Sequence, residues 1–266
     1  MTLQWVKVLL AHGILLEIEH YAFTSSCMKT DRKESNASKS TFKYPTVILI
    51  SFDGFRWDYI QRLNLKNFQR IIDNGVTAKS LESSFITKTF PNHLTLVTGL
   101  HEESHGIIAN KMYDPVFNQT FKPSTTDPKW WNSSRPIWIE NELFNSSTFN
   151  SGKRRRSATI FWVGSNIEYD GKLPYFYMPV YNSSFPFEDR FKLIVKLLKK
   201  DQPPNFIACY FHEPDATGHK FGPDSKQMNK TLTNIDRLLG RFLDDLEWHG
   251  FLNHVSWNYN NSWCLV

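Results

Sequence analysis

The sequence predicts an α/β protein with a mostly parallel sheet flanked by helices. Two runs, Thr46–Phe52 and Asn205–Phe211, are apolar on both faces, as strands buried inside a parallel sheet are. Segments with helical periodicity follow each run, and strands that alternate with helices are typical of a parallel sheet. The chain has 266 residues, of which 41% are hydrophobic, so it can bury a sizeable core.

The remaining elements follow from periodicity and from end signals along the chain. Phe187–Lys200 is amphipathic, with acidic residues first and basic residues last, which suits the helix dipole. We expect further helices at 65–75, 136–144 and 225–248, a strand at 158–165, and a loop at 112–123.

Charge and cysteine content exclude some classes of protein. The net charge of +5 is concentrated in Lys153–Arg156, and this run reads as a solvated loop rather than a surface for a nucleic-acid duplex. Three cysteines, Cys27, Cys209 and Cys264, give no disulfide framework, and Cys209 lies in an apolar run as a buried thiol would.

Two features favour the secretory pathway. Seven Asn-x-Ser/Thr sequons occur, at Asn36, Asn118, Asn132, Asn145, Asn182, Asn229 and Asn260. The apolar run Val8–Leu16 has about the length of a signal-peptide core and is too short to span a bilayer. A misplaced start of the chain explains this run equally well. We therefore expect residues 1–44 to be an apolar segment and a polar linker.

One threonine stands at an expected helix start. In "TKTFPNHLTLVTGL", Thr89 precedes Phe-Pro-Asn-His, and Leu94, Leu96, Val97 and Leu100 form an apolar stripe. The unpaired N–H groups and the positive dipole end of a helix N-terminus favour an anion. Thr89 is then either a helix cap or a nucleophile.

Acidic and histidine side chains follow the two buried strands. Asp53 ends the first strand, and Asp215 and His219 follow the second with four-residue spacing. Ligand sites in parallel sheets form beyond the C-terminal strand ends, and zinc takes Asp oxygen and His nitrogen ligands. Each residue alone is ordinary, as a turn or capping residue. Together with Thr89 they indicate a metal-dependent phosphoryl-transfer site, in which an amide such as Asn110 can hold phosphate oxygens.

Three segments resemble the ectonucleotide pyrophosphatase/phosphodiesterase family of the alkaline phosphatase superfamily. They are "ILISFDGFRWDYI", "TKTFPNHLTLVTGLHEESHGIIANKMYDP" and "HEPDATGHKFGPDS", and the resemblance covers about residues 44–250. It implies an alkaline-phosphatase-like fold and two zinc ions, one held by Asp53 and Thr89 and the other by Asp215 and His219. It also implies that Thr89 is the nucleophile, through a phospho-threonine intermediate, and that Asn110 contacts the substrate phosphate.

The resemblance also implies a nucleotide pocket. Phe90 and Tyr181 match the rings that sandwich the nucleobase, and Lys111 and Trp162 match further pocket positions. Aromatic rings favour a flat base through stacking. Asn166 stands where relatives often have Asp, which puts base selectivity in doubt. Core packing is the alternative role for the aromatic residues.

The family pattern changes character after Gly250. The family's next segment is a buried strand that ends in Asp-His-Gly and supplies further zinc ligands, but residues 251–266 contain no Asp-His-Gly and, being polar, do not read as a buried strand. Each zinc is left with two protein ligands where a catalytic site usually has three. We therefore expect residues 45–250 to be the N-terminal part of a catalytic domain, with a sheet that is incomplete and lacks a central strand. Residues 251–266 would be a divergent tail. The chain would then be a truncated or mis-spliced product, or an incomplete gene model, of an active phosphodiesterase, and its own turnover would be impaired.

Two classes of function follow from this sequence. The first is a zinc-dependent hydrolase of extracellular or cell-surface nucleotides that cleaves phosphodiester or pyrophosphate bonds, with membrane anchoring left to a longer product. The second is a non-catalytic secreted glycoprotein that binds nucleotides or a protein partner. Cleavage of lysophospholipids is a weaker third option, because the sequence shows no apolar channel and the Phe90/Tyr181 pair favours nucleotides.

Overall fold

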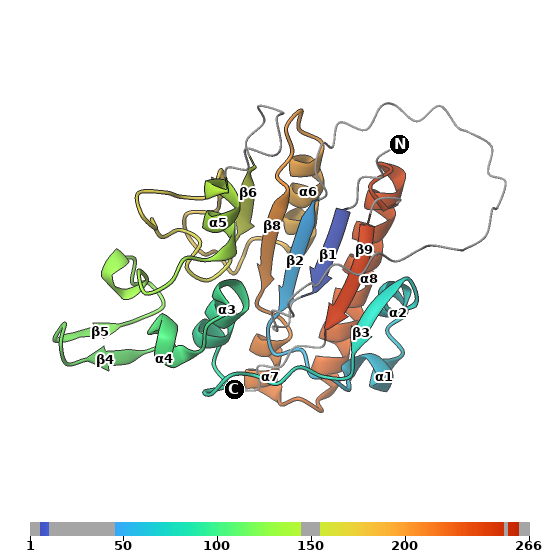
Figure 1. The fold of residues 1–266 in the computed structure, drawn as a ribbon. Coiled ribbons are helices and arrows are strands. Elements are labelled where there is room, and N and C mark those ends of the chain that lie inside the picture. The colour runs from blue at the N-terminus through green and yellow to red at the C-terminus, as the bar shows by residue number, and fades with distance from the viewer. Residues whose placement is uncertain (1–5, 11–45, 145–154, 253–254, 261–266) are drawn as a thin grey trace.

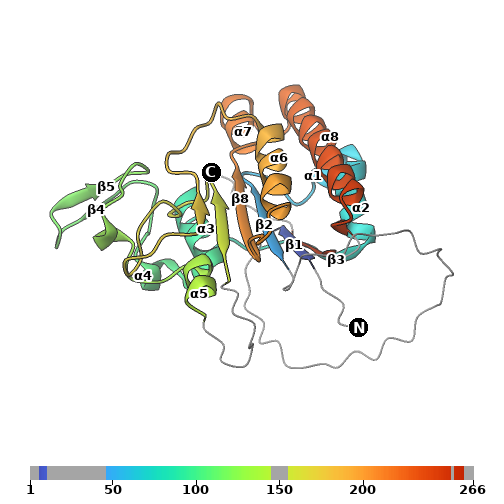
Figure 2. The ribbon, with the colours of Figure 1, turned by 90° about the horizontal axis from the view of Figure 1, so that it is seen from above.

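A seven-stranded parallel sheet forms the centre of the protein (Figures 1 and 2). The computed structural model describes residues 6–10, 46–144, 155–252 and 255–260. The strand order is β3-β9-β1-β2-β8-β6-β7, and every pairing is parallel. The strands are β1 (Val6–Leu10), β2 (Val47–Phe52), β3 (Gly75–Ala78), β6 (Ser157–Ile160), β7 (Phe176–Tyr177), β8 (Phe206–Phe211) and β9 (Val255–Asn260). This architecture confirms the predicted fold class.

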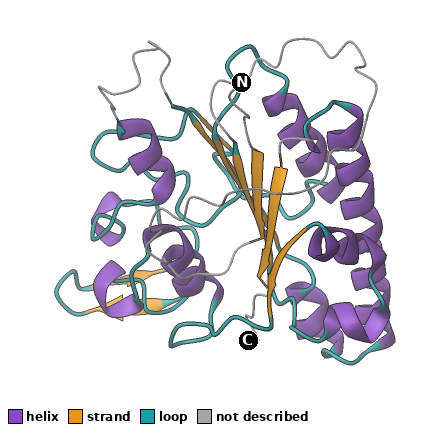
Figure 3. Cartoon of the chain, turned by 45° about the vertical axis from the view of Figure 1, so that its right-hand side comes forward, coloured by secondary structure: helices purple, strands orange, loops and turns teal. Residues whose placement is uncertain are grey.

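Helices cover both faces of the sheet (Figure 3). The α-helices are α1 (Tyr59–Leu63), α2 (Lys66–Asp73), α3 (Thr89–Thr98), α4 (Glu102–His105), α5 (Ile137–Leu143), α6 (Phe187–Leu198), α7 (Asp215–Phe221) and α8 (Lys226–Trp248), and a short 3-10 helix spans Pro128–Trp130. Helices α3 and α5 lie on one face, and α6 and α8 lie on the other (Figure 2). The sheet is therefore buried on both sides, which explains why its central strands are apolar throughout.

The core is centred on β2 and β8, the two strands that the sequence predicted. Phe52 and Phe211 stack across this pair with ring centroids 5.0 Å apart. Phe191 of α6 stacks on Phe242 of α8 at 4.6 Å, which joins the two long helices. Burying an aromatic or aliphatic side chain of this size contributes roughly 1.5–3 kcal/mol. Cys209 of β8 is fully buried, as predicted, and burial raises the pKa of its thiol.

The segment expected to be a loop at 112–123 is a β-hairpin instead. Strands β4 (Met112–Asp114) and β5 (Gln119–Phe121) pair antiparallel. The carboxylate of Asp114 accepts hydrogen bonds from the amides of Val116 and Phe117, at 2.7 and 2.8 Å, and this closes the turn. Phe121 is buried against two tryptophan rings. The strands are too short to show the alternating pattern on which a sequence prediction depends.

Two predicted elements are shorter than expected. Strand β6 ends at Ile160, because Phe161 takes a left-handed conformation with φ 58° and turns the chain away. Helix α3 ends at Thr98, where Gly99 adopts φ 70°. Leu100 therefore lies outside the helix and is exposed, so it does not belong to the apolar stripe of α3.

The two ends of the chain both contribute strands, contrary to expectation. Strand β9 lies between β3 and β1, although the polar segment after Gly250 was not expected to form one. Strand β1 (Val6–Leu10) lies between β2 and β9, and its last three residues belong to the run Val8–Leu16 that resembled a signal-peptide core. Backbone pairing with neighbouring strands does not depend on polarity, and this explains why the residue pattern failed to predict β9. In the described part of the chain, no helix is long and apolar enough to cross a membrane.

Some sequence predictions fall outside the described residues and stay predictions. These are the remainder of the apolar run, 11–16, the linker at 25–43, the tail residues 253–254 and 261–266, the start of the basic run at 153–154, and Cys27, Cys264, Asn36 and Asn145.

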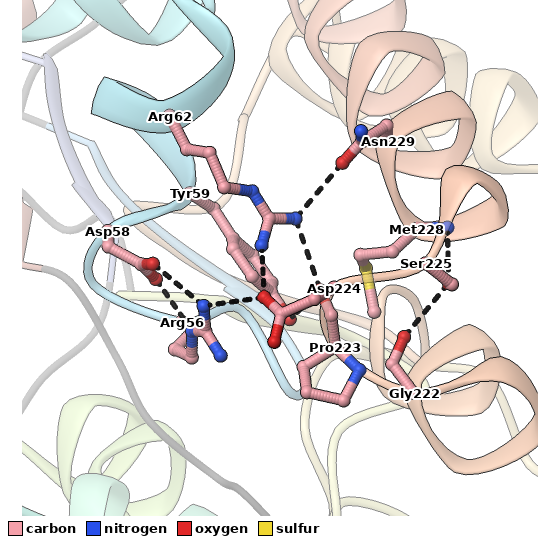
Figure 4. A network of polar contacts seen from close by, with 10 residues as sticks. All are labelled: Arg56, Asp58, Tyr59, Arg62, Gly222, Pro223, Asp224, Ser225, Met228 and Asn229. Carbon is pink, nitrogen blue, oxygen red and sulfur yellow. Dashed lines mark hydrogen bonds and ion pairs between the residues drawn. The ribbon is translucent and has the colours of Figure 1, made fainter.

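A network of ion pairs ties the loop after β2 to the loop between α7 and α8 (Figure 4). Arg56 donates to both carboxylate oxygens of Asp58, at 2.7 and 2.8 Å. Arg56 and Arg62 both donate to Asp224, at 3.0 and 2.7 Å, and Arg62 also donates to Asn229 at 3.1 Å. These contacts join residues more than 160 positions apart, so the network holds α1 against the start of α8.

The two-point contact between Arg56 and Asp58 makes this network sensitive to acid. The hydrogen bond from Arg56 holds the pKa of Asp58 below its ordinary value, although burial opposes the shift. A carboxyl group with a lowered folded-state pKa contributes stability above its unfolded pKa, about 3.9 for Asp. That contribution is lost as the pH falls through the folded-state pKa.

We predict that Asp58→Asn lowers the free energy of unfolding at pH 7 by about 1 kcal/mol, because it removes the charge from a two-point ion pair. The difference from the unchanged protein should shrink as the pH falls below about 4, where Asp58 itself becomes protonated. Urea unfolding followed by circular dichroism at several pH values measures both effects.

Asp244→Asn is the matched control, because Asp244 makes a more exposed contact of 2.9 Å with Arg70. This variant should change stability by less than about 0.5 kcal/mol at every pH. Equal losses in the two variants, or a loss in Asp58→Asn that does not depend on pH, would contradict the prediction.

Candidate active site

The pairing of β2 with β8 brings two of the candidate carboxylates to one edge of the sheet. Phe52 lies opposite Phe211, so Asp53 follows β2 where β8 ends. The amide of Asp53 donates to the carbonyl of Phe211, and the amide of Asp215 donates to the carbonyl of Asp53, both at 2.9 Å. Asp53 and the first residue of α7 are therefore in direct backbone contact, at the edge where sites in parallel sheets form.

Gly54 allows this close approach. It has φ +68°, and a Cβ atom on it would lie 2.6 Å from the Cα atom of Asp215. A side chain at this position would have to displace the backbone of α7. The glycine of the "SFDG" segment therefore has a steric role, and it is the only residue type that fits beside Asp215.

Asp53 has one buried oxygen that lacks a partner. The residue is 2% exposed, and its Oδ2 accepts a hydrogen bond of 2.7 Å from the hydroxyl of Tyr210. Its Oδ1 has no hydrogen-bond partner among the described residues. Leaving a buried charged acceptor unsatisfied costs a few kcal/mol, so this oxygen is a ready ligand for a cation.

Asp215 and His219 lie one turn apart on α7. The His219 Nε2 and Asp215 Oδ1 atoms are 3.4 Å apart, and the imidazole is half exposed. Burial first, and the charge of Asp53 second, raise the pKa of Asp215 to about 6. A bound cation between the two carboxylates would relieve this repulsion. Within the described ranges, no group of three or more His, Cys, Asp or Glu side chains is arranged to hold a metal ion.

Thr89 is the first residue of α3 and is half buried. The preceding Lys88 occupies the capping position without a side-chain hydrogen bond. The amide of Phe90 instead donates to Asn110 Oδ1 at 2.8 Å, so Asn110 serves as the cap. The charge of Lys88 acts on the pKa of Asp215 in the lowering direction, although burial and Asp53 outweigh it. This end of α3 is therefore close enough to α7 for its charge to act on Asp215. Thr89 is therefore not the residue that caps α3.

The four predicted pocket residues have different surroundings. Phe90 is half buried near the Phe121 ring at 6.1 Å, and Lys111 is exposed. Trp162 is 2% exposed and donates its indole N–H to a backbone carbonyl of α3 at 3.2 Å. This burial favours the core-packing alternative for Trp162. Tyr181 is 49% exposed, on the loop between β7 and α6.

Tyr181 stands close to the Asp53 edge of the sheet. Its ring centroid lies 6.0 Å from that of Tyr210, the residue that binds Asp53, and 6.3 Å from that of His212. Partial burial raises the pKa of its phenol. Asn166 lies on the neighbouring loop, where its amide donates to the carbonyl of Pro179 at 3.1 Å.

Sequence reasoning missed a buried arginine that organises the Tyr181 loop. Arg190 is fully buried and donates to the carbonyls of Tyr210 at 2.6 Å, Phe185 at 3.2 Å and Asn182 at 3.3 Å. Its guanidinium lies 4.8 Å from the centre of the Phe161 ring. Its place on the apolar face of α6, four residues before Ile194, was the available signal.

Two further residues near Asp53 were also missed. Tyr210 was hidden inside an apolar run, although the strand alternation places it one residue before the strand end. His212 follows β8, and burial lowers its pKa while its Nδ1 has no hydrogen-bond partner in the part of the chain that the structure describes. Neither residue type stands out in sequence without the register between β2 and β8.

A cavity with a mixed polar and apolar lining opens beside the segment that leads into α3. It has a volume of about 440 Å³, and its lining includes Arg56, Lys79, Ser83 and Thr87. The guanidinium of Arg56 is already paired with Asp58 and Asp224. Lys79, the other cation in this lining, is exposed to solvent. The cavity therefore offers the ammonium of Lys79 and hydroxyl groups, among them that of Thr87, two residues before Thr89.

Comparisons with known proteins show which sequences this chain is similar to. The chain is 41% identical over 215 residues to bis(5′-adenosyl)-triphosphatase of Homo sapiens, covering 80% of this chain and 46% of that protein. It is 40% identical to ectonucleotide pyrophosphatase/phosphodiesterase family member 5 of Homo sapiens, covering 76% of this chain and 41% of the relative. The chain thus spans about half the length of the curated relatives that it matches.

A solved structure has the same fold. Murine ectonucleotide pyrophosphatase/phosphodiesterase 5, an inactive threonine-to-alanine variant in complex with AMP, superposes with a TM-score of 0.72 at 38% identity, covering 79% of this chain and 54% of that chain. The profile of the type I phosphodiesterase / nucleotide pyrophosphatase family matches residues 47–256. With most of its length matched, the chain belongs to the type I phosphodiesterase / nucleotide pyrophosphatase family.

Proposed function

We propose that this chain carries the nucleophile half of a zinc-dependent nucleotide phosphodiesterase site. The observation that carries the proposal is the buried, unpartnered Oδ1 of Asp53, in backbone contact with the second carboxylate, Asp215. Two negative carboxylates on residues that are joined in this way repel each other unless a cation lies between them. Thr89, the first residue of α3, would supply the attacking hydroxyl.

The donor chemistry fits zinc. Asp53 and Thr89 would hold one ion, and Asp215 and His219 would hold the other, through oxygen and nitrogen atoms. Bound zinc lowers the pKa of a hydroxyl ligand and offsets negative charge on phosphate. Each ion has two side chains from the described residues, and a catalytic zinc usually has three protein ligands. We therefore expect weak zinc binding and impaired turnover.

The reaction requires a nucleophile and groups that hold the phosphate. The Thr89 hydroxyl gives its proton to water as its oxygen attacks phosphorus, the bond to the leaving oxygen breaks, and the leaving oxygen takes a proton from water. Water then attacks the phospho-threonine, which releases a nucleoside monophosphate and restores the hydroxyl. The amides of the α3 N-terminus, together with the side chain of Asn110, would hold the non-bridging oxygens as charge builds up.

Nucleotides are the substrate class that we propose. One relative is named as a bis(5′-adenosyl)-triphosphatase, and another was solved with AMP. Phe90 of α3 and Tyr181 of the β7–α6 loop would face the two sides of the base. Lys111, beside Asn110, would attract phosphate. Trp162 would support the pocket indirectly, by packing on α3.

We infer an extracellular or cell-surface setting from the ectonucleotide relatives. Residues 45–250 would be the N-terminal part of the catalytic domain, between the N-terminal segment at 1–44 and the tail at 251–266. Of the sequons with described side chains, Asn118, Asn132 and Asn182 are exposed. Asn229 differs, because it is half buried in α8 and its carboxamide oxygen accepts from Arg62 at 3.1 Å.

The second candidate is a non-catalytic binding protein. It is favoured by the donor sets, which hold two side chains for each ion within the described residues. Such a chain would bind a nucleotide through Asn110, Phe90 and Tyr181 without turning it over. Isothermal titration with AMP, beside the hydrolysis assay below, separates this function from catalysis.

We predict that hydrolysis of p-nitrophenyl thymidine 5′-monophosphate by the zinc-loaded protein falls by more than about 10³-fold in Thr89→Ala, because the nucleophile is lost. Thr89→Ser keeps a hydroxyl and should retain measurable turnover. Elemental analysis of both variants checks that zinc content is matched.

Two outcomes would decide against this prediction. Unchanged turnover in Thr89→Ala would remove Thr89 as the nucleophile. Binding of AMP without any turnover in the unchanged chain would favour the non-catalytic function.

We predict that the chain, expressed in the secretory pathway of mammalian cells, carries N-glycans at Asn118 and Asn182 but not at Asn229. The reason is accessibility, since Asn118 and Asn182 are exposed on loops, whereas Asn229 is half buried within a helix. Peptide mass spectrometry after enzymatic deglycosylation in ¹⁸O-water measures the occupancy of each site. Occupied Asn229, or no glycan on any site, would contradict the prediction.

A further inference from the structure

One buried histidine connects the backbone of Thr89 to the central strand. His93 is 3% exposed. Its Nδ1 lies 2.7 Å from the carbonyl oxygen of Thr89, and its Nε2 lies 2.8 Å from Ser51 Oγ. A carbonyl oxygen only accepts hydrogen bonds, so Nδ1 carries the proton. In the neutral ring, Nε2 then accepts from the hydroxyl of Ser51.

Ser51 lies in β2, and Asp53 follows the end of this strand two residues later. His93 therefore reaches from the carbonyl of Thr89 to the strand end that presents Asp53. The link between the two residues proposed to hold one zinc ion runs through Ser51 and the backbone of β2.

The imidazole has little freedom to rotate. The indole N–H of Trp162 donates to the His93 carbonyl at 3.2 Å, and the two rings meet edge to face with centroids 5.3 Å apart. The ring of Tyr210 also meets His93 edge to face at 5.1 Å. The hydroxyl of Tyr210 donates to Asp53 at 2.7 Å, so His93 and Asp53 share one buried neighbour.

We propose that His93 is a positioning residue, which, with Ser51, sets the first turn of α3 against the end of β2 and so places Thr89 beside Asp53. This inference rests on the proposed role of Thr89 as nucleophile. A histidine that only fills the core would need satisfied nitrogens, but their partners could lie anywhere. Here one partner is the nucleophile's own carbonyl and the other lies two residues before Asp53.

Ser51→Ala tests the link, and Ser157→Ala is its matched control. Ser157 is also a fully buried strand serine, and its hydroxyl donates to the carbonyl of Trp138 at 2.9 Å. Both variants should lower the melting temperature by a similar few degrees. Only Ser51→Ala should lower kcat, by roughly tenfold with little change in KM, because small displacements of a reacting group cost rate. Ser51→Thr keeps the hydroxyl and should restore kcat.

Nuclear magnetic resonance gives a measurement that does not depend on turnover. In ¹⁵N-labelled protein, the His93 ring should show a protonated Nδ1 and a bare Nε2. The amide signals of Thr89 and Phe90 should shift in Ser51→Ala and stay in place in Ser157→Ala. If the chain proves inactive, these signals still decide whether His93 positions the first turn of α3.

Three results would overturn the inference. The first is a His93 ring protonated at Nε2 alone. The second is Thr89 and Phe90 signals that do not move in Ser51→Ala. The third is an equal loss of kcat in Ser51→Ala and Ser157→Ala, which would show a general effect of lost stability.

Discussion

The parallel register between β2 and β8 is the constraint on which the rest of the site depends. Because Phe52 lies opposite Phe211, both strands end at one level, and the chain leaves them through Asp53 and through the turn into α7. The backbone bond from Asp215 to Asp53 fixes the second segment on the first. A shift of one residue in this register would turn the Asp53 side chain to the opposite face of the sheet.

The surroundings of this edge hold an unusual number of buried polar groups. His93, Arg190 and Asp53 are each nearly or fully buried. The nitrogens of His93 and Arg190 have partners on nearby backbone or hydroxyl groups, so their burial costs little. Asp53 is the exception, since one of its oxygens has no partner in the described residues. An apolar core would be easier to build, so the polar groups here are best explained by a ligand.

The sequence predicted the parts of this site that depend on local patterns. Apolar runs bounded by Asp-Gly and by a polar turn predicted β2 and β8, and the strand-end rule placed Asp53 and Asp215 at one edge. The amphipathic pattern predicted α6, and a helix was expected at 225–248, where α8 begins with Ser225 accepting a hydrogen bond from the Met228 amide. These features are short in range, or repeat along one segment, so they can be read without a structure.

The parts that were missed depend on contacts between distant residues. Strands β1 and β9 join the sheet through pairing with each other and with β2 and β3, which no local pattern encodes. Trp162 could have been a pocket wall or a core residue, and only its hydrogen bond to α3 separates the two roles. His93 was visible in the motif, but its function as a link required the position of Ser51.

Different contacts hold the proposed zinc ligands in place. Asp53 and Asp215 are joined by a backbone bond beside Gly54, and the Arg56–Asp224 network braces the loops that leave them. Thr89 is held to β2 through His93, on the opposite side of the site. These contacts are made by protein atoms alone, so they would hold the proposed ligands in place before zinc binds. Zinc would then bind to side chains that are already held in place. The affinity for zinc would be limited by the number of ligands rather than by how well they are positioned.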